Sequence, residues 1–440
     1  MSETRCASVL GLGFGDCGKG HFVDALTRRW KAHTVVRFSG GAQAGHNVVA
    51  HGRHHTFSQF GSGTFAPGTR TILLDPMALH PTALLVEAEA LARVGVHDAL
   101  SRVMIDAQCR ITTPYHQAAG RLRELLRGDA AHGTCGVGVG ETVRHSLAHP
   151  EQVMRYADLS HGSAAELDRL HTIRATLLAE LLPLCDAMDD GPMAVEIRTL
   201  QNESLAVPWM NTTKALARQC VPAAIEEIGA QLKRPGCVIF EGAQGVLLDE
   251  WRGFHPHTTW SSITTAAVEA AAARFDLASP IEHYGVLRTY LTRHGAGPLP
   301  THDASLDAAL PEPHNHSDGW QGRFRRGHPD AVLLRYALDA VGALSGLLIS
   351  HLDVFQRGVA LKWCGHYSHS SSSVERLPIG SRGDLAHQLA LTRLLESACP
   401  HYAADPLHAE RDFLDHLASV TALPVILRSC GTTPDDIRER

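Results

Sequence analysis

The sequence predicts an α/β fold built around one large, mostly parallel β-sheet, and three observations support this prediction. Short apolar stretches that end in glycine or polar residues alternate with longer stretches of helical periodicity. The chain of 440 residues is 44% hydrophobic and 20% charged, which is typical of a globular protein and excludes a disordered chain. No linker or internal repeat separates the segments. We therefore expect one domain over residues 1–440, with a helical insertion at approximately 151–231.

The individual elements follow from the apolar pattern. Seven short apolar stretches predict strands, at residues 7–11, 34–38, 71–74, 237–240, 284–288, 346–350 and 424–427. A helix is expected to start at 21–26, directly after a glycine-rich turn, and another is expected over 81–94, where Leu and Ala recur at helical spacing. Glycine or polar residues follow the carboxyl ends of the strands. In an α/β sheet that edge is where ligand loops are expected.

Composition excludes several function classes. The 40 Lys+Arg and 46 Asp+Glu give a net charge of −6, which disfavours a basic nucleic-acid binder. No apolar run reaches the roughly 18 residues that suggest a membrane span, and the N-terminus does not have the pattern of a signal peptide. The ten Cys include no CxxC pair and are predicted to be reduced thiols. We expect a cytoplasmic enzyme with neither a membrane nor a nucleic acid as partner.

A glycine-rich turn after the first predicted strand carries the strongest chemical signal. Residues 15–20 read Gly-Asp-Cys-Gly-Lys-Gly, and Lys19 is one of only five lysines in the chain. Glycines let a backbone approach phosphates, and the N-terminus of the following helix offers oriented N–H groups. The usual phosphate-loop spacing does not hold, because Gly20 stands where Ser or Thr would follow the lysine. A purely structural turn is the alternative. Asp16 argues against it, because an acid opposes anion binding unless it holds Mg²⁺ or moves a proton.

A second glycine-rich turn, at residues 40–46, follows the second predicted strand and ends in His46. A single histidine is usually structural. A histidine on one such turn beside an acid on another is a candidate acid/base pair, with Asp16 and His46 in the two roles.

These blocks resemble the adenylosuccinate synthetase family, and further blocks continue the likeness in the family's order along nearly the whole chain. They are residues 240–245, 247–249, 292–293, 295–298, 300–301, 322–326, 352–353 and 429–431. The resemblance implies the family's fold and a GTP-dependent ligase that forms a carbon–nitrogen bond. GTP phosphorylates the 6-oxygen of IMP, and the amine of aspartate then displaces the phosphate in purine biosynthesis. It also implies Mg²⁺ as cofactor and a homodimer.

By resemblance, each motif position has a role. Asp16 is the catalytic base and a Mg²⁺ ligand, His46 is the catalytic acid, and the Gly45 carbonyl is a second Mg²⁺ ligand. Lys19 acts on the GTP phosphates. The GTP-binding positions as a group are Gly15, Gly18, Lys19, Gly20, Gly45, His46, Arg325, His351, Asp353, Ser429 and Gly431. Acceptor-binding positions are Gln43, Thr134, Cys135, Gln244 and Thr259, and amine-donor positions are Trp320, Gln321 and Arg323.

The departures from the family concentrate on the acceptor and amine-donor sides. The family's Thr-Thr-Gly-Arg phosphate segment here reads Thr-Cys-Gly-Val at residues 134–137, and Trp320 and Gln321 replace two threonines of the aspartate loop. Arg144 and His149 are the nearest candidates for the arginine that the family lends across its dimer interface. On the GTP side, His351 replaces a lysine. Losing one charged phosphate contact costs about 1.5–3 kcal/mol.

Several functions therefore stay open. The chain is either a divergent ligase acting on IMP, or a relative that acts on a modified purine nucleotide, a nucleoside or a non-nucleotide acceptor. A GTP-dependent kinase that adds no amine is a third possibility. A non-catalytic GTP-binding relative is disfavoured, because Asp16, His46 and Lys19 are all present.

Overall fold

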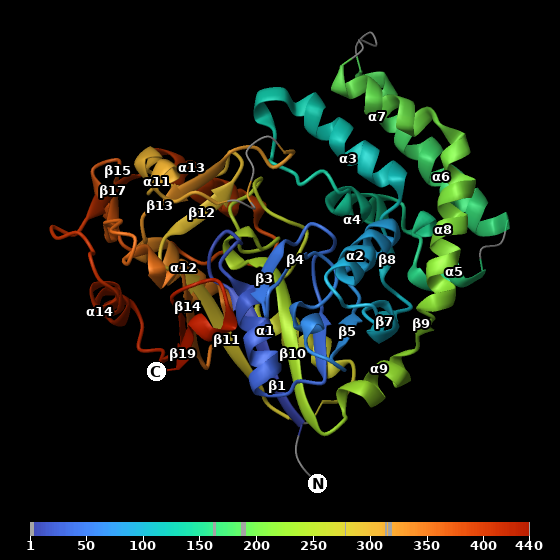
Figure 1. The fold of residues 1–440 in the computed structure, drawn as a ribbon. Helices are drawn as coiled ribbons and strands as arrows, with labels where there is room; N and C mark the ends of the chain where they lie inside the picture. Colours follow the sequence, from blue (N-terminus) through green and yellow to red (C-terminus); the bar gives the residue numbers. More distant parts are fainter. Residues whose placement is uncertain are drawn as a thin grey trace.

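A ten-stranded, mostly parallel sheet organises the protein, as Figure 1 shows for this computed structural model. The structure describes residues 4–161, 164–185, 191–277, 279–312, 315 and 319–439. Across the sheet the strands follow the order β19 (Ile437–Glu439), β18 (Val425–Ser429), β14 (Gly346–Ser350), β11 (Ile281–Arg288), β1 (Thr4–Gly11), β10 (Gly236–Gly245), β2 (Thr34–Arg37), β5 (Arg70–Leu73), β7 (Val103–Asp106) and β9 (Pro222–Ala223). Only β19 runs antiparallel to its neighbour. The prediction of the fold class is confirmed.

The central strands are buried on both faces, which explains why their sequences read as nearly continuous apolar runs. Along β1, Ala7 and Val9 pack with the core that includes α1 (Lys19–Arg29), whereas Cys6 and Leu10 pack into the core on the opposite face. Each of the seven predicted strands coincides with a strand of this sheet.

Helices cover the sheet and extend beyond one edge. They are α2 (Pro81–Arg93), α3 (Pro114–Arg127), α4 (Val139–Ala148), α5 (Tyr156–His161), α6 (Ala164–Leu181), α7 (Pro192–Gln201), α8 (Ala206–Gln219), α9 (Ile225–Leu232), α10 (Thr265–Ala273), α11 (Ala304–Ala309), α12 (Ala331–Val341), α13 (Leu385–Ser397) and α14 (Glu410–Val420). Figure 1 shows α3 and α5 to α8 gathered on the side where β7 and β9 end the sheet. The helices α5 to α9 fall in the region of the predicted insertion, and their status as an insertion stays a prediction.

Smaller two- and three-stranded sheets accompany the ten-stranded sheet. The hairpin of β3 (His46–Ala50) and β4 (Arg53–Phe57) follows β2, and β12 (Leu291–His294) pairs with β13 (Phe324–Gly327). Two further small sheets join β6 (Ala78–Leu79) to β8 (Arg110–Ile111), and β15 (Cys364–His369) to β16 (Ser372–Val374) and β17 (Cys399–Tyr402). The ten cysteines are free thiols. Within the described residues, no helix is both long and apolar enough to cross a membrane.

Candidate active site

A cavity of about 1030 Å³ opens at the carboxyl ends of the central strands. The loops that follow β1, β2, β10, β14 and β18 all contribute to its wall. Sixteen of the residues predicted to form the site line it: Asp16, Gly18, Lys19, Gly20, Gln43, Gly45, His46, Thr134, Cys135, Gln244, Thr259, Gln321, His351, Asp353, Ser429 and Gly431. The topology of the sheet therefore brings together positions that lie up to 415 residues apart (431 minus 16).

The turn between β1 and α1 has a backbone that favours glycine. Gly15 and Gly18 have φ of 90° and 88°, and Asp16 between them has φ of 45°. Asp is among the residues that tolerate this left-handed region. The turn also lies against the end of β10, because a Cβ on Gly245 would come 2.0 Å from the Gly13 carbonyl oxygen. Gly15 itself does not line the cavity, although a Cβ there would lie 3.2 Å from Gln244 Oε1.

Lys19 is a buried cation in the first turn of α1. The residue is 3% exposed, and its ammonium donates to the Cys17 sulfur at 3.8 Å. No described carboxylate pairs with it, although buried charges are normally paired. Since Lys19 lines the cavity beside the N-terminus of α1, its surroundings suit an anionic ligand.

His46 is held between two acceptor oxygens. Its Nδ1 lies 2.6 Å from Glu241 Oε1, and its Nε2 lies 3.0 Å from the Ala243 carbonyl. Burial alone would raise the pKa of the Glu241 carboxyl, but His46, Arg37 and the Ser62 hydroxyl together lower it to about 2. Only the doubly protonated imidazolium donates to both oxygens at once. Burial opposes this charge and lowers the pKa of His46, although Glu241 acts to raise it. Glu241 therefore orients the predicted catalytic acid, and its hydrogen bond favours the protonated ring against the cost of burial.

Asp16 has two contacts outside its own loop. Its carboxylate lies 3.5 Å from His294 Nε2, and its backbone carbonyl accepts a hydrogen bond of 2.9 Å from Arg288 Nη1. Arg288 also pairs with Glu312. Glu241, Arg288 and His294 were not among the predicted site residues. Glu241 directly follows the predicted strand at 237–240 and precedes a glycine, so it was identifiable by that signal, although in the structure it lies within β10. The contacts of Arg288 and His294 with Asp16 cross more than 270 residues.

Asp353 and Ser429, which follow and end β14 and β18, both line the cavity. Asp353 Oδ2 pairs with Arg357 Nη2 at 2.5 Å. The Ser429 hydroxyl donates to the Gly431 carbonyl at 2.9 Å and lies 3.0 Å from His21 Nε2. Since the hydroxyl proton is already used, His21 Nε2 is the donor of that bond. Burial lowers the pKa of His21 to about 4, so the ring is neutral.

The opposite end of the cavity contains the altered segment at residues 133–137. The carboxylate of Glu124 accepts from the backbone amides of Gly133 and Thr134, at 2.5 and 3.1 Å, and Arg121 Nε donates to the Gly136 carbonyl at 2.7 Å. Thr134 and Cys135 line the cavity here. Two further predicted acceptor positions, Gln244 and Thr259, also line the cavity, and Thr259 Oγ1 donates to the Leu248 carbonyl.

Gln43 comes to the cavity from the loop after β2. Its Oε1 is buried without a hydrogen-bond partner among the described residues. A buried acceptor without a partner is costly, so this side chain suits a ligand with a polar hydrogen.

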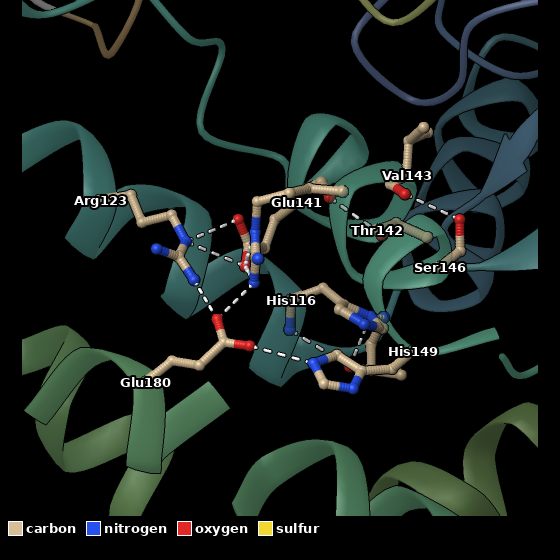
Figure 2. Close-up of polar contacts among 11 residues, drawn as sticks. His116, Arg123, Glu141, Thr142, Val143, Ser146, His149 and Glu180 are labelled. Atoms are coloured by element: carbon tan, nitrogen blue, oxygen red, sulfur yellow. Dashed lines mark hydrogen bonds and ion pairs between the residues drawn. The ribbon is translucent and has the colours of Figure 1, made fainter. Parts of the chain in front are cut away.

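Both candidates for the interface arginine are engaged within the chain. Figure 2 shows Arg123 on α3, Glu141 on α4 and Glu180 on α6 in one polar network. Arg144 joins it through Glu141 and Glu180, each at 2.7 Å, and His149 Nε2 lies 3.2 Å from Glu180 Oε1.

Three predicted site residues near β13 do not line the cavity. They are Trp320 and Arg323 in the loop before β13, and Arg325 within it. The Arg323 side chain is 62% exposed and pairs with Asp307 at 2.7 Å, while Arg325 donates to the Gly297 carbonyl. Trp320 packs on the altered segment, since a Cβ on Gly136 would come 2.6 Å from its ring. Among the residues predicted to bind the amine donor, only Gln321 lines the cavity.

Comparison with solved structures shows which fold the chain has. The fold matches that of the fully ligated adenylosuccinate synthetase of Plasmodium falciparum with a TM-score of 0.77 at 18% identity, covering 99% of this chain and 100% of the other. It also matches the succinoaminodeoxyadenylate synthetase of cyanophage S-2L, solved with dGMP and with dATP as an energy donor. That match has a TM-score of 0.61 at 16% identity and covers 99% and 95% of the two chains.

Sequence comparison is more specific. The family model for adenylosuccinate synthetase matches residues 8–433. The chain is 31% identical to the adenylosuccinate synthetase of Myxococcus xanthus, over 96% of this chain and 95% of the relative. It is also 31% identical to that of Verminephrobacter eiseniae, over 99% and 96%. The chain belongs to the adenylosuccinate synthetase family, and it is a GTP-dependent ligase of the kind that forms carbon–nitrogen bonds.

Proposed function

We propose that this enzyme uses GTP and Mg²⁺ to phosphorylate an oxygen of IMP or a related acceptor, and then joins the acceptor to the amine of aspartate or another amino acid. In the first step the γ-phosphoryl group passes from GTP to the acceptor oxygen, leaving GDP. In the second step the amine nitrogen attacks the carbon that bears this oxygen. A C–N bond forms, the C–O bond breaks, and inorganic phosphate leaves with the oxygen.

The buried, unpaired ammonium of Lys19 is the observation that carries this proposal. A structural glycine turn has no need of a buried cation, whereas a triphosphate supplies the missing negative charge. The N–H groups at the start of α1 add to this phosphate site, together with the backbone of Gly18 and Gly20.

Asp16 and His46 are proposed to move the protons. Asp16 removes a proton from the acceptor ring, so that the ring oxygen becomes nucleophilic, and His46 donates to the charge that develops during transfer. Since both nitrogens of His46 face protein oxygens here, Nε2 has to leave the Ala243 carbonyl to reach a substrate. We therefore expect the loop at residues 40–46 to rearrange when substrates bind.

The residues present fit Mg²⁺. Asp16 offers a carboxylate and Gly45 offers a carbonyl at the same cavity, and both are hard oxygen ligands. No group of three or more His, Cys, Asp or Glu among the described residues forms a complete metal cage. Mg²⁺ suits such a sparse site, because it keeps waters and binds substrate phosphates. When bound, the ion would neutralise charge on the phosphates during transfer.

The acceptor is the open part of the proposal. Cys135 and Val137 replace a hydroxyl and a guanidinium of the family's phosphate segment, and Trp320 packs against that same segment. These changes favour a related acceptor, such as a modified purine nucleotide or a nucleoside, as the second candidate beside IMP. A homodimer is proposed from the family. Arg144 and His149, the nearest candidates for the arginine that crosses the family's interface, both contact Glu180 of the same chain.

A steady-state assay with GTP, Mg²⁺, IMP and aspartate tests the proposal by following phosphate release and product absorbance. Rapid turnover establishes the IMP reaction. Phosphate release and C–N bond formation with a modified purine or nucleoside instead establish the second candidate. Release of a phosphorylated acceptor without C–N bond formation contradicts the ligase step.

A further inference from the structure

Asp16 has a fixed backbone, but its carboxylate has few contacts to orient it. The turn holds the residue with a left-handed φ of 45°, and Arg288 Nη1 donates to its backbone carbonyl at 2.9 Å. The side chain is 28% exposed, and among the described residues only His294 pairs with it, with Nε2 3.5 Å from Oδ2. The direction of the carboxylate therefore depends on its own torsions and on His294.

The ring of His294 is itself held in place. His294 ends β12 and lies opposite Phe324 on β13, and the centroids of the two rings are 4.6 Å apart. Its Nε2 also lies 3.3 Å from Asn315 Oδ1. The ionised carboxylate of Asp16 and the amide oxygen of Asn315 can only accept hydrogen bonds, so Nε2 carries a proton. A hydrogen-bond donor thus faces the base of the proposed reaction.

The other ring nitrogen of His294 contributes nothing to the stability of the fold. Nδ1 is buried and has no partner among the described residues. A buried polar atom without a partner costs free energy, and an apolar side chain would pack on Phe324 without that cost. What the histidine adds at this position is the N–H group that faces Asp16.

We propose that His294 is a positioning residue for Asp16: its Nε2–H donates to Oδ2 and holds the carboxylate in the direction in which it takes the acceptor's proton. This inference rests on the proposed role of Asp16 as the base. The bond uses one lone pair of Oδ2, and the carboxylate keeps other lone pairs for the proton and a metal ion. A distance of 3.5 Å is long for a hydrogen bond, and catalytic contacts in free enzymes often shorten when substrates bind.

Two matched substitutions test the N–H group itself. In His294→Gln the side-chain amide reaches about as far as Nε2 and still donates. In His294→Asn the amide is one bond shorter and reaches only as far as Nδ1. The readout is phosphate release and C–N bond formation with GTP, Mg²⁺, aspartate and IMP, or inosine if the wild type uses it in place of IMP. We expect His294→Asn to lower kcat by about tenfold to a hundredfold, and His294→Gln to recover most of this loss.

A double-mutant cycle separates an effect through Asp16 from a direct contact with the acceptor. If His294 acts through Asp16, adding His294→Asn to Asp16→Asn should cause no further loss of activity. Single-turnover measurements with enzyme in excess follow these slow variants. His401→Asn changes an exposed histidine of β17 that does not line the cavity, and should have the turnover of the wild type. Thermal unfolding checks that each variant is folded.

Three results would overturn the inference. They are equal turnover in His294→Gln and His294→Asn, wild-type turnover in His294→Asn, and a further loss when His294→Asn is added to Asp16→Asn. If the wild type releases no phosphate with either acceptor, the proposed reaction itself fails, and the role of His294 fails with it.

Discussion

Asp16 lies in a turn whose left-handed backbone is set by the glycines on either side, and its carboxylate makes no described hydrogen bond. Replacing it with Asn should therefore leave the fold intact. It should lower phosphate release by about 10²–10⁴-fold, the usual effect of losing a general base. Steady-state assays on Asp16→Asn measure this, with thermal unfolding as the control for an intact fold. Turnover equal to the wild type would show that Asp16 is not the general base.

Glu241 predicts a particular dependence of stability on pH. Its pKa falls from 4.5 in the unfolded chain to about 2 in the folded protein. A lowered carboxyl pKa stabilises the fold above pH 4.5, and this contribution is lost as pH falls through about 2.

Glu241→Gln tests this dependence, because the amide does not titrate. The free energy of unfolding, measured by denaturant titration between pH 6 and 3, should fall less steeply in Glu241→Gln than in the wild type. Parallel slopes would mean that this carboxyl is not held ionised by His46.

At the scale of elements, α1 and β3 approach each other through Gly20. A Cβ there would lie 2.7 Å from the Cβ of His46. Gly20→Ala should displace His46 from Glu241 and lower turnover by tenfold or more, even though alanine favours a helix by about 0.5–1 kcal/mol.

Gly229→Ala in α9 is the matched control. A Cβ at that position meets only Phe275, at an ordinary contact distance of 3.6 Å. It should raise the midpoint of thermal unfolding and leave turnover unchanged. If Gly20→Ala is as active as Gly229→Ala, the close approach of α1 and β3 does not position His46.

At the scale of the whole molecule, the cavity exists only when the strands from β18 through β14, β11 and β1 to β10 lie side by side in the sheet. GTP and Mg²⁺ should therefore bind the folded chain and not the unfolded chain. At a hundred times the dissociation constant they would stabilise it by about 2.7 kcal/mol and raise the unfolding midpoint by a few degrees. Differential scanning fluorimetry measures this, and a chelator should reverse most of the increase. An increase that the chelator does not affect would argue against Mg²⁺ in the donor complex.

The parallel sheet was predictable because buried strands have a local signature. The stretches at 7–11 and 237–240 are apolar and end at glycine turns, and they became the neighbours β1 and β10. The hairpin of β3 and β4 was not predicted, because β4 reads Arg-His-His-Thr-Phe and has exposed polar positions. Its stability depends on pairing with β3 and not on its own pattern.

The candidate site also contains some residues that were predictable from the sequence and some that were not. Asp16 and His46 follow strands at glycine turns, so their position at one edge of the sheet follows from topology. Partners such as His294 come from strands hundreds of residues away, and no local pattern encodes such distances. Arg323 was predicted from its motif alone, and here it pairs with Asp307 outside the cavity wall.

The way in which residues 133–137 are anchored has a consequence for how the enzyme can change. Glu124 and Arg121, both on α3, hold this loop by its backbone, so its side chains carry little of the burden of keeping it in place. Substitutions at Cys135 and Val137 can then accumulate without unfolding the loop. The acceptor specificity of the enzyme can therefore change through a few side chains, while the backbone of the loop stays in place. A library randomised at residues 134, 135 and 137 would sample new acceptors at small risk to folding.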